Sequence, residues 1–273
     1  MKKLRVLSLG AGVQSSTLAL MVEKGEIPKV DCGIFADVGG EPQTVYDHLE
    51  YLKKQVSYPI HIVQWRDLKK DVISASNGHF KGFTAPFFSQ NTMTGKKSML
   101  MRQCTNTYKI QPIIQKIRFL LGYKKGQRVH KDVKVELLMG ISFDEMQRMK
   151  INQLKYIQNI YPLVELAIRR RNCIEWLNKN GYQTPPRSAC TFCPYHTNAE
   201  WREIKKNKKE WEEVVKIDKM IRDQEKYKKN KDKIVDKIYL HRDCKPIDEV
   251  DLRTDEEKGQ YSLLDECDGI CGV

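Results

Sequence analysis

Short apolar runs alternate with helix-like repeats through residues 1–165. The runs at 4–9, 30–37, 60–65 and 133–140 are short and mostly apolar, which is typical of strands buried on both faces. Residues 17–24, a stretch beginning near residue 41, and residues 111–121 have helical spacing. In the second of these, Val45, Leu49 and Leu52 recur four and three residues apart and predict its buried face. Strands separated by helices predict an α/β fold with a doubly wound, mostly parallel sheet.

The remaining chain is more polar and more helical. We predict a helix over 164–180, ended by Gly181, and one or two highly charged helices over 198–229. Residues 77–99 are rich in Gly, Ser, Thr, Phe and Asn without a clear period, which predicts a long loop or lid. Residues 161–163 are expected to end the sheet. The chain therefore divides into an α/β domain over 1–165 and a helical, cysteine-containing extension over 166–273.

The connection from the first strand to the first helix has the features of an anion site. A strand, a turn of small residues and a helix amino terminus direct free N–H groups into one place. Gly10 and Gly12 allow close approach of a phosphate, and Ser15 and Ser16 are expected to cap the helix. The alternative is an ordinary tight β–α connection, since the spacing fits neither common phosphate-loop pattern.

Polar residues follow two other predicted strands. Asp37 ends the second strand and is followed by Gly39 and Glu41. Ligands of such sheets bind beyond the carboxyl ends of the strands, so we expect Asp37 at a ligand site, with a turn cap as the alternative. The strand over 133–140 is followed by a second polar group that we place at the rim of the same site: Ser142, Asp144, Glu145 and Arg148.

Positive charge is concentrated in one part of the chain. The net charge is +13, yet residues 72–131 contain eleven Lys or Arg and no Asp or Glu. Such a segment attracts polyanions. Four interleaved aromatic residues suit base stacking, so we predict a tRNA or DNA partner; they are Phe80, Phe83, Phe87 and Phe88. The alternatives are a solvated basic surface and a positive charge that serves a nucleotide substrate.

The amino-terminal apolar run is too short for a signal peptide, and no run reaches membrane-spanning length. We therefore interpret the chain as cytoplasmic and without a membrane partner.

The eight cysteines are unevenly spaced and include one Cys-x-x-Cys pair, Cys190 and Cys193. Two intervening residues let both thiolates reach one metal ion, so the pair fits zinc, an iron–sulfur cluster or a redox dithiol. We interpret Cys32 and Cys244 as small buried hydrophobic residues. His196 is interpreted as a polar cap, with zinc ligation as the alternative.

Several of these segments together resemble one superfamily, the phosphoadenosine-phosphosulfate (PAPS) reductases and related adenine nucleotide α-hydrolases. Residues 10–15 are similar to the PP-loop Ser-Gly-Gly-x-Asp-Ser, with Gly10 in place of the first Ser and Gln14 in place of the Asp. Residues 37–41 resemble the Asp-Thr-Gly…Glu stretch, and 140–149 resemble the Gly-Ile-Arg-x-x-Glu region. Residues 103–113 resemble the Cys-Cys-x-x-x-Lys-Val-x-Pro-Leu segment of cluster-bearing adenylylsulfate reductases, with Gln103 in place of one cysteine.

The resemblance implies a five-stranded sheet, a site for ATP or PAPS, and Mg²⁺. The residues it assigns to the nucleotide are Ser8, Gly10, Ala11, Gly12, Val13, Gln14, Ser15, Ser16, Asp37, Gly39, Glu41, Gly140, Ser142, Asp144, Glu145 and Arg148. It assigns a [4Fe–4S] cluster, with zinc as the alternative, to Cys104, Cys190 and Cys193. Cys173 is the first candidate for the fourth ligand, and an open iron position is the second.

Three functions are consistent with this resemblance. The first is ATP-dependent thiolation of a nucleic acid, with release of pyrophosphate and sulfur transfer through the cluster. The second is reduction of a phosphosulfate nucleotide, in which Cys267 is the working thiol, Cys271 its resolver and Lys109 a further catalytic residue. In an alternative view of this tail, Cys267 or Cys271 completes the metal site. The third is a regulator that binds nucleotide and cluster without turnover. The expected partners are a redox or sulfur-donor protein and a second copy of the chain.

Overall fold

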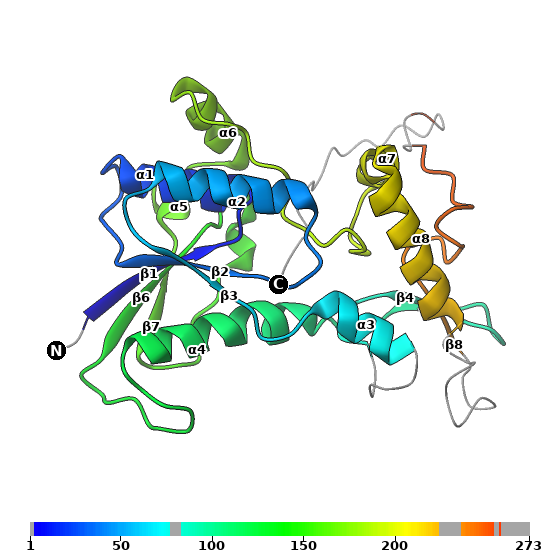
Figure 1. Ribbon diagram of the computed structural model, residues 1–273, viewed down its shortest axis with the longest axis horizontal. Coiled ribbons are helices and arrows are strands. Elements are labelled where there is room, and N and C mark those ends of the chain that lie inside the picture. The colour runs from blue at the N-terminus through cyan, green and yellow to red at the C-terminus, as the bar shows by residue number, and fades with distance from the viewer. Residues whose placement is uncertain (1–2, 77–82, 224–235, 254–256, 258–273) are drawn as a thin grey trace.

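A five-stranded parallel sheet forms the centre of the computed structural model, which describes residues 3–76, 83–223, 236–253 and 257 (Figure 1). The strand order is β3-β2-β1-β6-β7. In β1, Val6 pairs with Cys32 on one side and with Leu137 on the other. The strands are β1 (Lys3–Leu9), β2 (Cys32–Ala36), β3 (Ile60–Val63), β6 (Lys134–Met139) and β7 (Ile157–Ile160). The predicted α/β class with a parallel five-stranded sheet is confirmed.

Helices cover both faces of this sheet. One face carries α1 (Val13–Glu23), α2 (Gln43–Gln55), α5 (Pro162–Glu165) and α6 (Arg170–Lys179), and the other carries α4 (Gln111–Leu120) (Figure 1). Val45, Leu49 and Leu52 are all buried on α2, as their spacing predicted. On the opposite face, Ile113 and Ile117 of α4 pack against the side chains of β2. The sheet is therefore doubly wound.

Two helix boundaries differ from the prediction. The first helix begins at Val13 rather than at residue 17, and the Ser16 N–H donates to the Gly12 carbonyl at 2.9 Å. The apolar pattern did not indicate this earlier start, because most residues of the first turn are small or polar although they are buried. The predicted helix over 164–180 is two helices, since the chain turns at Ala167, whose φ of 53° is left-handed.

A second, antiparallel sheet of three strands lies beside the first, in the order β5-β4-β8. It consists of β4 (Phe88–Asn91), β5 (Lys97–Met99) and β8 (Asp236–Tyr239), and it packs with α3 (Leu68–Ser76), α7 (Asn198–Lys206) and α8 (Lys208–Arg222). The prediction of a loop over 77–99 is therefore wrong for its second half, which forms a hairpin; residues 77–82 lie outside the described residues. The hairpin is short and polar, and its stabilising partner β8 lies far away in the sequence.

A buried carboxylate ties the second sheet to its helices. Asp218 of α8 is fully buried and accepts hydrogen bonds from the N–H groups of Leu240 and Ile247 at 3.0 and 3.1 Å. The Arg222 Nε also donates to it at 3.0 Å. Residues 198–223 thus belong to this second layer, whereas α6 packs against α1. The boundary at residue 165 stays a prediction.

Within the described residues, no helix is both long and apolar enough to cross a membrane.

The contact between α1 and α2 contains a buried histidine. His48 is 4% exposed, and its Nε2 lies 3.1 Å from the Ser16 Oγ. Burial lowers the pKa of His48 to about 4, below its usual 6.5. The folded state therefore holds this ring neutral, and the associated stability is present above pH 6.5 and is lost as the pH falls towards 4.

We predict that His48→Gln removes part of the acid sensitivity of folding. Between pH 7 and pH 5 the wild type should lose on the order of 2 kcal/mol more stability than the variant, because its unfolded state binds a proton that the folded state excludes. Urea unfolding at both pH values measures this difference. His130→Gln, at an exposed position, serves as the control and should keep the wild-type dependence. Equal pH dependence in His48→Gln and the wild type would contradict the assignment.

Candidate functional site

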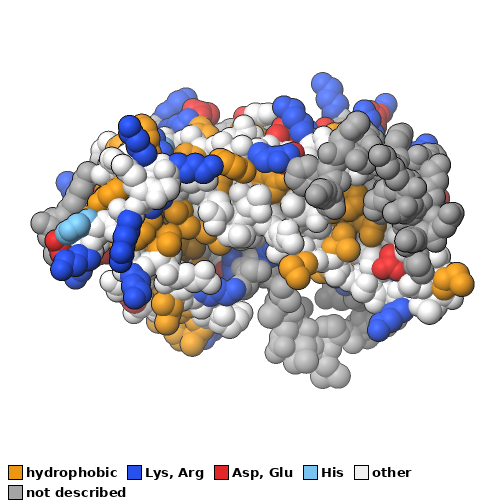
Figure 2. Space-filling view, turned by 90° about the horizontal axis from the view of Figure 1, so that it is seen from below, with side chains coloured by type: hydrophobic (Ala, Val, Ile, Leu, Met, Phe, Trp, Pro, Cys, Tyr) orange, Lys and Arg blue, Asp and Glu red, His pale blue; other side chains and the backbone are white. Residues whose placement is uncertain are grey.

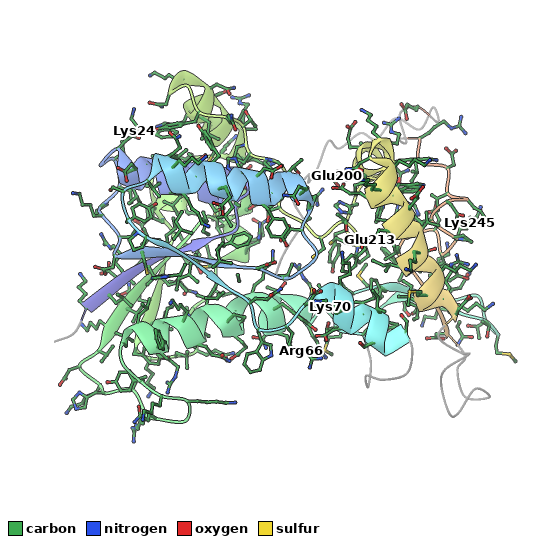
Figure 3. All side chains as sticks on the ribbon, viewed as in Figure 1. Lys24, Arg66, Lys70, Glu200, Glu213 and Lys245 are labelled. Atoms are coloured by element: carbon green, nitrogen blue, oxygen red, sulfur yellow. The ribbon has the colours of Figure 1, made fainter. Side chains whose placement is uncertain are left out.

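A cavity of about 640 Å³ opens at the carboxyl edge of the five-stranded sheet. Its walls come from the β1–α1 loop, the segment after β6, the short π-helix η1 (Thr105–Ile110) that leads into α4, and residues 187–200. Figure 3 shows Glu200, one of its lining residues, on the α7 side. The predicted site residues that line it are Ser8, Gly10, Gly12, Val13, Gln14, Ser15, Lys109, Gly140, Glu145 and Arg148.

The β1–α1 loop presents a helix amino terminus to this cavity. Gly12 is the N-cap in an extended conformation, and no side chain among the described residues caps the helix. Ser15 instead closes the loop on itself, since its Oγ accepts from the Gly10 N–H and donates to the Gly12 carbonyl, both at 3.2 Å. The prediction that Ser15 and Ser16 cap α1 is therefore wrong, because both lie inside its first turn. The first amides of α1 remain available to an anion.

Ala11 is the strained position of this loop. Its φ of 55° is left-handed, a conformation that costs a residue with a Cβ about 1–2 kcal/mol. The residue is fully buried and lies outside the cavity lining. Surrounding packing therefore holds the backbone in the shape that turns the chain from β1 into α1.

Gln14 connects two charged groups of opposite sign. Its Nε2 donates to the Glu145 carboxylate at 3.2 Å, and its Oε1 accepts from the Arg170 guanidinium at 2.8 Å. Glu145 in turn accepts from Arg148 at 2.5 Å. A neutral amide can serve both neighbours because it carries a donor and an acceptor, whereas a carboxylate at this position would repel Glu145. The chain Arg170–Gln14–Glu145–Arg148 holds two guanidinium groups at the cavity.

The residues around this chain act as supports. Burial raises the pKa of the Glu145 carboxyl, and the neighbouring Arg148 opposes that shift. Ser142 is fully buried at 3.5 Å from the Gln14 amide nitrogen. The Asp144 carboxylate accepts from the Arg170 backbone N–H at 3.1 and 3.3 Å, at the start of α6. Asp144 and Ser142 therefore orient cavity residues without lining the cavity themselves.

The structure places Asp37 at a turn. Its Oδ1 accepts from the Gly39 N–H and from the Tyr46 hydroxyl, both at 2.8 Å, and Gly39 has a left-handed φ of 72°. Glu41, by contrast, lies against the cavity wall with its side chain 1% exposed. It accepts from Lys109 at 3.3 Å and from Ser188 at 3.4 Å. Of the Asp37–Glu41 stretch, Glu41 is thus the residue that contacts the cavity lining.

Lys109 is a permanent cation of the site. Burial alone lowers the pKa of its ammonium group, but the charge of the Glu41 carboxylate and its hydrogen bond to Lys109 act in the opposite direction, and the net pKa is raised. The side chain is 38% exposed and lines the cavity. Lys109 therefore stays protonated at neutral pH, which suits it to bind an anion and not to act as a base.

The cysteines within the described residues do not form a ready metal site. Burial, followed by the Glu41 carboxylate, raises the pKa of the Cys190 thiol well above its usual range, and Cys104 is close enough to add to this shift. Cys173 is fully buried in the core that surrounds α1, whereas Cys104 and Cys190 pack against the second core. The structure therefore places Cys173 in a different core from Cys104 and Cys190. In the described part of the chain, no three His, Cys, Asp or Glu side chains are arranged to hold a metal ion.

The Cys-x-x-Cys turn is nevertheless well ordered. The Cys193 N–H donates to the Cys190 carbonyl at 2.9 Å, and the His196 Nε2 lies 2.9 Å from the same carbonyl. Burial lowers the pKa of His196 to about 4, so the ring is neutral at pH 7. Cys267 and Cys271 lie outside the described residues.

Several cavity residues were missed by the sequence analysis. They are Arg102, Thr105, Lys150, Tyr161, Arg170, Arg187, Ser188 and Thr197, together with Glu200, which pairs with Arg187. Arg170 belongs to the run of three arginines at 169–171, and that run was the signal available in the sequence. In all, the lining contains six Lys or Arg and two Glu, so the cavity is positive.

No family model matches the chain, and no curated protein matches its sequence. Among solved structures, it is similar to the crystal structure of phosphoadenylyl-sulfate (PAPS) reductase from Candida auris in complex with phosphate. The identity is 15% and the TM-score 0.42, over 68% of this chain and 75% of that chain. At this level of similarity the match carries no argument about activity.

Gly140 lies close to the first turn of α1, and we predict that Gly140→Ala damages both stability and ligand binding. A Cβ there would lie 2.7 Å from the Ser15 Cα and 2.8 Å from the Ser15 nitrogen, so the first turn of α1 must move. We expect a loss of about 1–3 kcal/mol in the free energy of unfolding.

Gly12→Ala is the matched control for this experiment. Its Cβ would lie 3.5 Å from the Ser188 Cβ and 3.8 Å from the Ser188 nitrogen, which are ordinary contacts. Denaturant unfolding should therefore leave Gly12→Ala close to the wild type. Equal stability of the two alanine variants would show that the β6–α1 approach is not tight.

Proposed function

We propose that the cavity binds an adenine nucleotide, with ATP as the substrate, and that the chain is an enzyme that acts at its phosphates. The observation that carries this proposal is that the uncapped amino terminus of α1 faces a positively charged cavity. The lining of that cavity contains six Lys or Arg and two Glu. Backbone N–H groups and guanidinium groups together favour a polyphosphate over a single carboxylate.

The apolar part of the lining suits a base. Ile110, Ile113, Met139, Ile141 and Tyr161 share the cavity with the charged residues. Flat heteroaromatic rings bind in such mixed pockets, in which apolar walls bury the ring and a few polar groups orient it. The resemblance of residues 10–15 to a PP-loop supports adenine as the base.

The proposed reaction is attack by an acceptor on the α-phosphorus of ATP. The acceptor forms a new bond to that phosphorus, the bond to the bridging oxygen breaks, and pyrophosphate leaves with the electron pair. The amides at the start of α1, together with Arg148, Arg170 and protonated Lys109, would stabilise the charge that develops on the pyrophosphate. Gln14 positions Arg170 for this role and does not itself need to carry charge.

Two finer hypotheses from the sequence attach to this site. One is sulfur transfer through a [4Fe–4S] cluster at Cys104, Cys190 and Cys193, which would follow the proposed activation step and is not part of it. The other is reduction of a phosphosulfate nucleotide by Cys267. PAPS fits the same positive cavity and is therefore the alternative ligand.

We predict that ATP binds and that Arg170→Ala weakens binding by roughly 10- to 100-fold, the loss of one or two charge-assisted hydrogen bonds. Gln14→Glu should weaken binding in the same direction, since its carboxylate would repel Glu145 and add negative charge beside the phosphates. Isothermal titration with ATP, PAPS, adenylylsulfate and GTP measures affinity, and a coupled pyrophosphate assay measures turnover.

The control for these variants is Lys216→Ala, on the exposed face of α8 and away from the cavity lining. It should bind ATP like the wild type. A wild-type protein that binds PAPS but not ATP would replace the proposed reaction by the reductase alternative. Absence of binding to every nucleotide would overturn the nucleotide site itself.

A further inference from the structure

Two of the aromatic residues expected to stack on bases, Phe83 and Phe87, pack in the second core instead. Phe87 is fully buried, and its ring lies 5.3 Å from the ring of Phe83 in an edge-to-face contact within the second core. Phe88 is half-buried on β4, and Phe80 lies outside the described residues. Phe83 and Phe87 fill a core, because the basic segment around them supplies part of the second layer.

Two other aromatic rings are exposed where the basic segment reaches the surface. Phe119, in the last turn of α4, is 71% exposed, and Trp65, which follows β3, is 47% exposed. A lysine ammonium group lies near each ring. The Lys116 Nζ is 5.1 Å from the centroid of the Phe119 ring, and the Lys125 Nζ is 5.9 Å from the centroid of the Trp65 ring. Such cation–π pairs hold the ammonium group beside the ring while leaving much of the ring open.

The loop that follows α4 is held in place by its own hydrogen bonds. Arg118 donates to the carbonyls of Lys124 and Gln127, and the Lys124 N–H donates to the Gln127 Oε1 at 2.7 Å. The Tyr123 hydroxyl accepts from the His130 N–H at 3.1 Å. The exposed side chains of Lys124, Lys125 and Arg128 therefore project from a defined turn.

Three carboxylates close to this segment in the sequence have partners. Asp67 pairs with Lys70 at 3.4 Å, and Asp132 lies 3.2 Å from His130. Asp71 is nearly buried and pairs with Arg66. In the view from the α4 side, Lys and Arg clearly outnumber Asp and Glu, and hydrophobic side chains lie among them (Figure 2). This surface combines positive charge with open aromatic faces.

We propose that this α4 face, defined as Trp65, Lys116, Phe119, Lys124, Lys125 and Arg128, binds single-stranded nucleic acid. Unpaired bases stack on Phe119 and Trp65, and the lysines and Arg128 contact phosphates. A duplex hides the faces of its bases, so the exposed rings favour a single strand. Binding here is independent of which nucleotide occupies the cavity.

The position of α4 links the two sites. Ile113, in its first turn, lines the cavity, and Phe119 is in its last turn. A ten-residue helix spans about 15 Å, so a strand on this face passes within a few nucleotides of the cavity. A single-stranded RNA or DNA is thus the acceptor class that the surface selects.

The test separates stacking from charge. Fluorescence anisotropy with labelled single-stranded RNA and DNA 20-mers is measured over a salt series. Phe119→Ala and Trp65→Ala should each weaken binding by roughly 5- to 150-fold with an unchanged salt slope. Replacement of Lys124, Lys125 and Arg128 by alanine should reduce the slope of log K against log salt by about 2, since each phosphate that these side chains neutralise contributes about 0.7.

Matched controls exclude unfolding and general charge effects. Alanine at the exposed Lys209, Lys216 and Lys219 of α8 removes the same charge elsewhere and should leave affinity and slope at wild-type values. Phe119→Tyr keeps a ring and should restore binding. ATP affinity should be wild-type in every α4-face variant, so failure of the nucleotide site is distinguished from failure of this surface.

Several outcomes would overturn the proposal. One is absence of binding to single strands at low ionic strength. Another is equal affinity for duplex and single strand with no effect of Phe119→Ala or Trp65→Ala, which would indicate a general polyanion surface. A third is that oligonucleotides fail to bind while the wild-type protein sediments with phosphatidylserine vesicles and the α4-face variants do not. That result would assign the face to binding of an anionic lipid surface.

Discussion

The site depends on a steric constraint, the close approach of the end of β6 to the first turn of α1. Gly140 lies so near Ser15 that no side chain fits between them. This approach places the amino terminus of α1 over the carboxyl edge of the sheet, where its amides face the cavity. The left-handed Ala11 and the extended Gly12 are the conformations that the chain needs to enter the helix there.

Electrostatics then determine what this edge can bind. The Gln14 amide donates a hydrogen bond to the Glu145 carboxylate and accepts one from the Arg170 guanidinium, without adding charge. Because Glu145 is already paired with Arg148, the two carboxylates of the lining leave the cavity positive. The arrangement selects phosphate-bearing ligands and holds their arginine partners before the ligand arrives.

An ion pair with a buried carboxylate joins the two layers of the molecule. Glu41, between β2 and α2, contacts Lys109 of η1 and Ser188 of the loop before α7. The thiol of Cys190 lies in the same low-dielectric region and stays protonated, since burial and the nearby carboxylate both disfavour a thiolate. The negative charge of Glu41 at this junction is therefore compensated by Lys109.

The sequence by itself determined most of the first layer. Apolar runs and helical repeats identified four of the five strands and the helices that cover them, because burial on a parallel sheet imposes a continuous apolar pattern on each strand. Small residues and glycines also located the β1–α1 loop and the polar rim after β6. These features depend only on residues that are neighbours in the sequence, so they can be predicted without the tertiary structure.

Only the tertiary structure decided which distant segments meet. The hairpin of β4 and β5 is stabilised by β8, and its short polar strands carry no periodic signal. Arg170 and Arg187 lie in the cavity although both follow residue 165, and Phe87 is buried while Phe119 is exposed. The physical reason is that the type of a residue determines only whether burial, a polar partner or solvent stabilises it. Which residue becomes its partner depends on how the layers pack.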